Sequence, residues 1–68
     1  LRAALRRALE SLTEREALVI QLYYVEECNI YEIAEILEVT TGRISQIKKA
    51  AITTLRHRLA ELTGDTQD

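Results

Sequence analysis

The sequence has no proline, only two glycines and no long apolar segment in its 68 residues. Proline and glycine interrupt helices more strongly than any other residues, so their scarcity favours helices joined by short turns. No apolar stretch approaches the roughly 20 residues that a membrane-spanning helix requires. A chain of this length buries only a small core, and the composition therefore predicts one compact, soluble, helical domain.

Cysteine is present once, as Cys28, which excludes a disulfide within the chain. The protein therefore needs no oxidising compartment, and we expect it to be cytoplasmic. Neither a histidine nor a second cysteine lies at metal-ligand spacing from Cys28, so we expect a small, half-buried turn residue, no metal and no cofactor. No secretory signal opens the chain. A helical pattern already runs at Leu1, and we interpret the sequence as a fragment of a longer protein.

Catalytic patterns are also scarce. The only histidine, His57, is expected on a basic helix without a nearby acid on the same face, and no serine lies in a nucleophile elbow. The carboxylates are spread along helix faces that we expect to be exposed. The sequence therefore predicts that the chain is not an enzyme.

Charge is distributed unevenly along a chain whose net charge is -2. Residues 1–38 carry four arginines against eight glutamates, whereas residues 39–62 carry five basic residues against Glu61 alone. The five basic residues are Arg43, Lys48, Lys49, Arg56 and Arg58. A basic run is usually only a solvated helix face, so this asymmetry favours nucleic-acid binding modestly.

Apolar residues recur at steps of three and four, which predicts four amphipathic helices. The first should end near Ser11. Thr13 with Glu16, and Asn29 with Glu32, have the spacing of capping boxes, in which cap and third residue satisfy each other's backbone amides. They predict a second helix from residue 14, apolar over a wide arc and packed on more than one side, and a third over residues 30–37.

A fourth, long helix is predicted over residues 41–62, because Thr40 can cap it and apolar residues continue along its whole length. Gly64 is suited to end it. We therefore expect a folded domain over residues 1–62 and a flexible tail over residues 63–68.

The third and fourth helices are separated by about three residues, 38–40, which is the spacing of a helix-turn-helix. Small Ala34 would let the two helices cross closely, while branched side chains fill the angle between them. These are Ile33, Val39, Ile44 and Ile47. The pattern favours the DNA-binding motif over a generic helical hairpin.

The outward face of the fourth helix carries short hydrogen-bonding groups over its first two turns. Gln46 can pair with adenine through two hydrogen bonds, Ser45 can donate or accept, and the Thr41 methyl group can meet a thymine methyl. The predicted outward arc consists of Thr41, Gly42, Ser45, Gln46 and Lys49.

Backbone phosphates are the expected partners of the flanking residues Arg43 and Lys48. The free amides that follow the caps are further phosphate sites, and Tyr31 either adds a hydroxyl contact or is a plain surface residue. Gly42 has two readings: it permits close approach to the groove, or it only loosens the first turn.

The segments "LTEREALVIQLYY" and "EECNIYEIAEILEVTTGRISQIKKAAITTLRHRL" resemble region four of bacterial sigma factors, the domain that binds the promoter −35 element. The resemblance covers residues 9–62. The Tyr23-Tyr24 pair followed by Glu27 and Asn29, together with the segment "RISQI" at residues 43–47, is closer to the flagellar-type alternative sigma factors than to the housekeeping one. It implies binding in the major groove of −35 DNA, through residues of the first two turns of the recognition helix. Carried over by position, these are Thr41, Gly42, Arg43, Ser45 and Gln46, with Lys49 next along the same face.

The resemblance also implies protein partners. In the family, the concave apolar side holds the flap-tip helix of the RNA polymerase β subunit, and flagellar-type members are held by an anti-sigma factor. Four departures stand out. Thr41, Gly42 and Ser45 replace the housekeeping Arg, Glu and Arg, so the base preference should differ, and Glu38 replaces the usual turn glycine.

Two alternatives stay open from the sequence. The output domain of a two-component or quorum-type regulator also ends in a helix-turn-helix unit, although the basic residues of the last helix argue against its usual apolar dimer seam. A decoy that binds polymerase or an anti-sigma factor without binding DNA would suit the acidic net charge.

Overall fold

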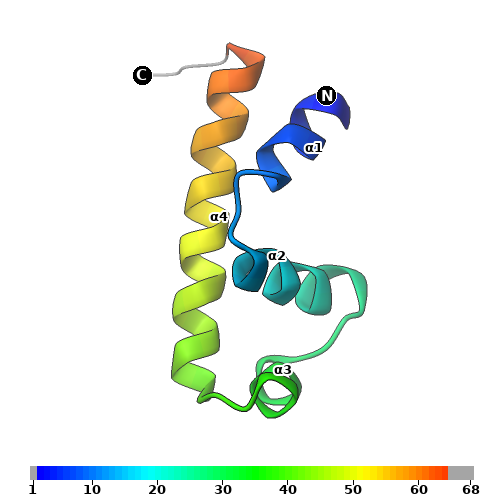
Figure 1. Cartoon of the computed structure of the whole chain (residues 1–68), viewed down its shortest axis with the longest axis vertical. Helices are drawn as coiled ribbons and strands as arrows, with labels where there is room; N and C mark the ends of the chain where they lie inside the picture. Colours follow the sequence, from blue (N-terminus) through cyan, green and yellow to red (C-terminus); the bar gives the residue numbers. More distant parts are fainter. Residues whose placement is uncertain (1, 65–68) are drawn as a thin grey trace.

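The computed structural model describes residues 2–64 and contains four α-helices and one π-helical turn. These elements are α1 (Arg2–Leu9), α2 (Glu14–Ile20), η1 (Gln21–Val25), which continues α2, α3 (Ile30–Leu37) and α4 (Thr41–Thr63). The three shorter helices follow one another along one side of α4, with α1 beside its later half and α3 beside its first turns (Figure 1). The predicted all-α, four-helix unit is confirmed. None of the helices within residues 2–64 is both long and apolar enough to cross a membrane.

Both predicted capping boxes are present. Glu16 N donates to Thr13 Oγ1 at 3.1 Å, and Thr13 N donates to Glu16 Oε1 at 3.1 Å. The same exchange joins Asn29 and Glu32 at 2.9 and 2.8 Å. Because the first amides of a helix have no partner within it, these side chains fix where α2 and α3 begin.

Two helix ends differ slightly from the prediction. The first helix ends at Leu9, and a turn leads through Ser11. The last helix continues through Thr63 and ends at Gly64, whose left-handed backbone (φ 72°) makes glycine suitable there. Leu1 and residues 65–68, which include most of the predicted tail, lie outside the described residues.

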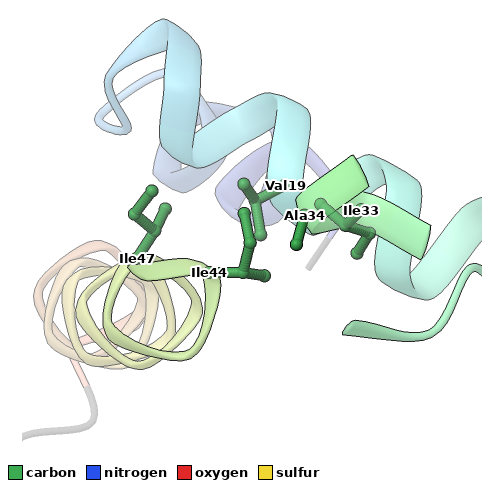
Figure 2. Packing of buried hydrophobic residues seen from close by; sticks show 5 residues of the cluster. All are labelled: Val19, Ile33, Ala34, Ile44 and Ile47. Atoms are coloured by element: carbon green, nitrogen blue, oxygen red, sulfur yellow. The ribbon is translucent and has the colours of Figure 1, made fainter. Parts of the chain in front are cut away.

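The core lies where α2, α3 and α4 meet. Val19 of α2 points at the same space as the inward side chains of α3 and α4 (Figure 2). The buried cluster consists of Val19, Ile33, Ala34, Ile44 and Ile47. Leu37 and Val39 pack against it while partly exposed, so the predicted filling of the helix-turn-helix angle is confirmed.

The N-terminal half buries less apolar surface than its pattern predicts. Leu5 and Leu9 of α1 keep 44% and 38% of their surface exposed, and Val25 at the end of η1 keeps 69%. Leu18 is also exposed, so the prediction that the second helix packs on more than one side is wrong for Leu18 and Val25. The fold thus leaves apolar side chains uncovered on α1, α2 and η1.

Candidate DNA-binding interface

The turn between α3 and α4 keeps the predicted length and has a defined geometry. Glu38 adopts the left-handed conformation (φ 59°, ψ 44°). Val39 N donates to Ala34 O at 3.0 Å, and Glu38 N donates to Glu35 O at 3.3 Å. These two bonds form a Schellman motif, which normally has glycine at its left-handed position. Glu38 therefore occupies the left-handed position that the motif normally gives to glycine.

Ala34 is the small residue at the helix crossing. Its side chain is 6% exposed and lies in the same cluster as Ile44, which is fully buried (Figure 2). A longer side chain at Ala34 would have to displace Ile33 or Ile44, because interiors are close-packed. The crossing and the turn together fix the direction of α4 relative to α3.

The first turn of α4 is anchored at its cap. Arg43 N donates to Thr40 Oγ1 at 3.1 Å, and Ile44 N donates to Thr40 O at 3.1 Å. Thr40 has the extended backbone typical of an N-cap (φ -80°, ψ 158°). The predicted cap is confirmed, and it gives the polar residues that follow a fixed helical position.

Most of the predicted contact residues lie on the outer surface of these first turns. Thr41 is half-buried, and the others in its arc are exposed, together with Arg43. The exposed residues are Gly42, Arg43, Ser45, Gln46 and Lys49. Within residues 2–64 neither Arg43 nor Lys49 forms an ion pair, so both charges are available to an anionic ligand.

Lys48, predicted as a flanking phosphate contact, has an aromatic neighbour within the domain. Its side chain is half-buried, and its Nζ lies 3.7 Å from the centroid of the Tyr23 ring. A cation over an aromatic face is attracted by the negative electrostatic potential of the ring. The structure therefore gives the Lys48 ammonium a partner inside the domain, on the flank where the sequence predicts a phosphate contact.

Tyr31 and Cys28 lie near each other at the start of α3. Tyr31 is 75% exposed and borders a shallow surface hollow with Cys28, Asn29 and Tyr23. The expected half-buried position of Cys28 is confirmed. Both readings of Tyr31, a phosphate contact and a plain surface residue, are compatible with this exposure.

The later turns of α4 carry further polar residues next to the contact residues that the sequence predicts. A hollow along α4 is bordered by Ser45, Lys48, Lys49, Ile52, Thr53 and Arg56. Thr53 and Arg56 lie four and seven residues after Lys49, a spacing that keeps them on one helix face. From this spacing, Thr53 could have been predicted as part of the same surface.

The two basic residues at the end of α4 are engaged within the domain. Arg58 donates to Ser11 Oγ from Nε and to Glu61 Oε1 from a guanidinium nitrogen, both at 3.1 Å. His57 Nε2 lies 4.0 Å from Glu61 Oε2, one turn later. The expectation that His57 has no nearby acid on its face is therefore wrong, although its side chain is 81% exposed.

A short helix, a left-handed turn and a second helix with an exposed polar first turn define a helix-turn-helix DNA-binding domain. Comparison with known proteins agrees: residues 8–57 match the family model for sigma-70, region 4. The chain belongs to the sigma-70 region 4 family.

Individual relatives point in the same direction. RNA polymerase sigma factor FliA of Salmonella typhimurium is 50% identical over 62 residues, which cover 91% of this chain and 26% of the relative. FliA of Escherichia coli K12 is 48% identical over the same length, with the same coverage. RNA polymerase sigma-D factor of Bacillus subtilis is 39% identical over 60 residues, covering 88% of this chain and 24% of that protein. The chain thus spans about a quarter of the length of these relatives. No solved structure is matched with significance.

These matches confirm the resemblance to the flagellar-type sigma factors that the sequence suggests. They do not favour the regulator output domain or the decoy module.

Proposed function

We propose that this chain recognises the −35 element of promoters as region four of a flagellar-type sigma factor in transcription initiation. The observation that carries the proposal is the exposed, polar first part of α4, held at a fixed angle by the close crossing at Ala34. In this role the side chains of Gln46, Ser45 and Thr41 face base edges, while those of Arg43 and Lys49 face phosphates. The role requires no catalytic group, and it places the protein with polymerase and promoter DNA in the bacterial cytoplasm.

The surroundings of the basic side chains on α4 limit how many of them can contact DNA phosphates. Of the five basic residues on α4, Lys48 lies on the Tyr23 ring and Arg58 is bonded to Ser11 and Glu61. Arg43, Lys49 and Arg56 are exposed, and none of the three forms an ion pair within residues 2–64. Three phosphate contacts predict a slope of log K against log salt of about -2.7, from about 0.9 per phosphate. The chain should therefore bind promoter DNA weakly by itself.

Polymerase supplies the missing affinity in this proposal. A hollow between α1 and the α2-η1 helix is lined almost entirely by apolar side chains, at Leu9, Ala17, Ile20, Gln21 and Val25. The family resemblance implies that this side of the domain holds the flap-tip helix of the β subunit, which would cover the exposed part of Leu9 and Val25. Linking the domain to polymerase then raises its effective concentration at the promoter. An anti-sigma factor is the further partner that the resemblance implies.

The proposal is tested by measuring binding to short duplexes by fluorescence anisotropy at several salt concentrations. The duplexes carry a flagellar-type −35 element, or that element with each base pair changed in turn. We expect Gln46→Ala to weaken binding by about 1–3 kcal/mol and to remove the preference at one base position. We expect Arg43→Ala to weaken binding to every duplex and to reduce the salt slope by about 0.9.

Arg15→Ala is the matched control, because Arg15 is also an exposed arginine and lies on α2, away from the first turns of α4. It should leave both the affinity and the base preference unchanged. If Arg43→Ala and Gln46→Ala behave like this control at every salt concentration, DNA reading by α4 is wrong.

A further inference from the structure

Lys48 and Tyr23 form the one cation–π pair in the part of the chain that the structure describes. Tyr23 belongs to η1 and Lys48 to α4, so the contact joins two elements that are separated by α3 along the chain. The Tyr23 ring is itself held, since Tyr24 meets it edge-on with ring centroids 4.8 Å apart and ring planes 77° apart. The lysine thus lies on a ring whose own orientation is supported.

The π-helical backbone of η1 is what carries the ring. Glu26 N donates to Gln21 O at 3.0 Å, five residues earlier, so this segment is wider than an α-helix. After the left-handed Glu27, Cys28 N donates to Leu22 O at 2.9 Å and closes the end of the helix. Each π-helical turn includes an extra residue, which changes the direction of the side chains relative to a continuous α-helix. Tyr23, in the middle of this segment, packs against the core cluster and reaches Lys48.

Lys48 and Lys49 are neighbours with opposite surroundings. Lys49 is exposed and has no ion pair within residues 2–64, whereas Lys48 is half-buried against Tyr23. To reach a phosphate, Lys48 would have to leave the ring and lose that attraction. A lysine that stays on the ring instead adds a contact on the flank of α4 to those of the buried Ile44 and Ile47, which hold the helix at one rotation about its own axis.

We propose that Tyr23 is a positioning residue for DNA reading: it holds Lys48 through the ring face, so that Lys48 orients the recognition turns of α4 and does not neutralise a phosphate. This rests on the proposed function, because it assumes that α4 reads the −35 element. The contact sets which residues of α4 face outward, and among them Ser45, Gln46 and Lys49 gain a fixed direction.

The test compares adjacent lysines on the −35 duplex, using the full chain. Lys48→Met keeps an unbranched side chain without the charge, and Lys49→Met is the matched control. We expect Lys48→Met to weaken specific binding about two- to ten-fold with an unchanged salt slope. We expect Lys49→Met to reduce the slope by about 0.9, as one lost phosphate contact does. A loss of slope in Lys48→Met equal to that of Lys49→Met would overturn the proposal.

Tyr23 supplies the second half of the test. Tyr23→Leu should weaken binding as much as Lys48→Met does, and combining the two changes should cost no more than either alone. Additive losses would mean that the two residues act separately, which contradicts the proposal. Tyr23→Phe keeps the ring face and should bind like the unmodified chain, so a loss in Tyr23→Leu is not a general effect of altering the hydroxyl.

A measurement without DNA separates this proposal from the proposed function. In the free chain, the Lys48 side-chain protons next to the ammonium should show NMR shifts upfield from the ring current of Tyr23, and Tyr23→Leu should abolish those shifts. Absence of the shifts overturns the positioning role while leaving −35 recognition intact. If the shifts are present but the unmodified chain shows no preference for the −35 duplex, recognition by α4 and the positioning role built on it both fail.

Discussion

The guanidinium of Arg58 donates from Nε to Ser11 Oγ at 3.1 Å, joining two residues 47 positions apart. Ser11 lies in the turn after α1, so this bond attaches the N-terminal part of the domain to the later half of α4. The same guanidinium also donates to Glu61. Arg58 is therefore engaged in partly exposed contacts within the domain, whereas Arg56, two residues earlier, is exposed.

Arg56→Ala and Arg58→Ala should have different effects for this reason. Arg56→Ala should reduce the salt slope of −35 duplex binding by about 0.9, since an exposed arginine on the α4 hollow can meet a phosphate. Arg58→Ala should leave that slope unchanged and lower the free energy of unfolding by about 0.5–1 kcal/mol, as expected for a partly exposed polar network. Anisotropy titrations and urea unfolding measure the two quantities. If Arg56→Ala has the same salt slope as the unmodified chain, Arg56 makes no phosphate contact.

Ala34→Leu should destabilise the domain by about 1–3 kcal/mol, because the added atoms have no space beside Ile44 at the helix crossing. Urea unfolding followed by circular dichroism measures the loss. Ala50→Leu is the control: Ala50 is exposed on α4, so the same substitution should change stability by less than about 0.5 kcal/mol. Equal losses at the two sites would mean that Ala34 is not needed for a close crossing.

Glu38→Gly should raise the free energy of unfolding by about 0.5–1 kcal/mol, although glycine usually destabilises. A left-handed backbone costs an ordinary residue about 1–2 kcal/mol, more than the entropy that glycine gains on unfolding. The control is Glu35→Gly inside α3, which should lower stability by about 1 kcal/mol. Thermal or urea unfolding checks the opposite signs. A loss at both positions would contradict the left-handed turn.

The features that could be predicted from the sequence are those set within three or four residues. Thr13, Asn29 and Thr40 each bond to a backbone amide three residues on, so their positions alone locate the starts of α2, α3 and α4. The Ala34 crossing was also predictable, because a small residue among branched ones indicates a close approach. The same local periodicity identified the outward arc that includes Gln46.

The features that could not be predicted depend on contacts between distant residues or on an irregular backbone. No periodicity of the sequence predicts the π-helical turn. Without knowledge of that turn, the direction of the Tyr23 side chain cannot be predicted. The angular position of Lys48 alone therefore predicts a phosphate contact on the flank of the recognition helix. The sequence indicates only that Arg58 is basic, because its bond to Ser11 joins residues 47 positions apart and no local pattern predicts it. In both cases a basic side chain contacts a residue that is distant from it in the sequence.

Gly42 provides the sharpest test of what the first turn of α4 does. A Cβ added there would meet only Thr40 Oγ1, at 3.9 Å, and the backbone is not left-handed, so the fold itself does not require glycine. Gly42→Ala should therefore raise the free energy of unfolding by up to about 1 kcal/mol. Gly64→Ala is the contrasting change and should lower it, because that backbone has φ +72°. We nevertheless expect Gly42→Ala to weaken binding to the −35 duplex, since a glycine on an exposed helix face permits close approach of the backbone to a groove. Binding that strengthens together with stability would mean that Gly42 only loosens the first turn.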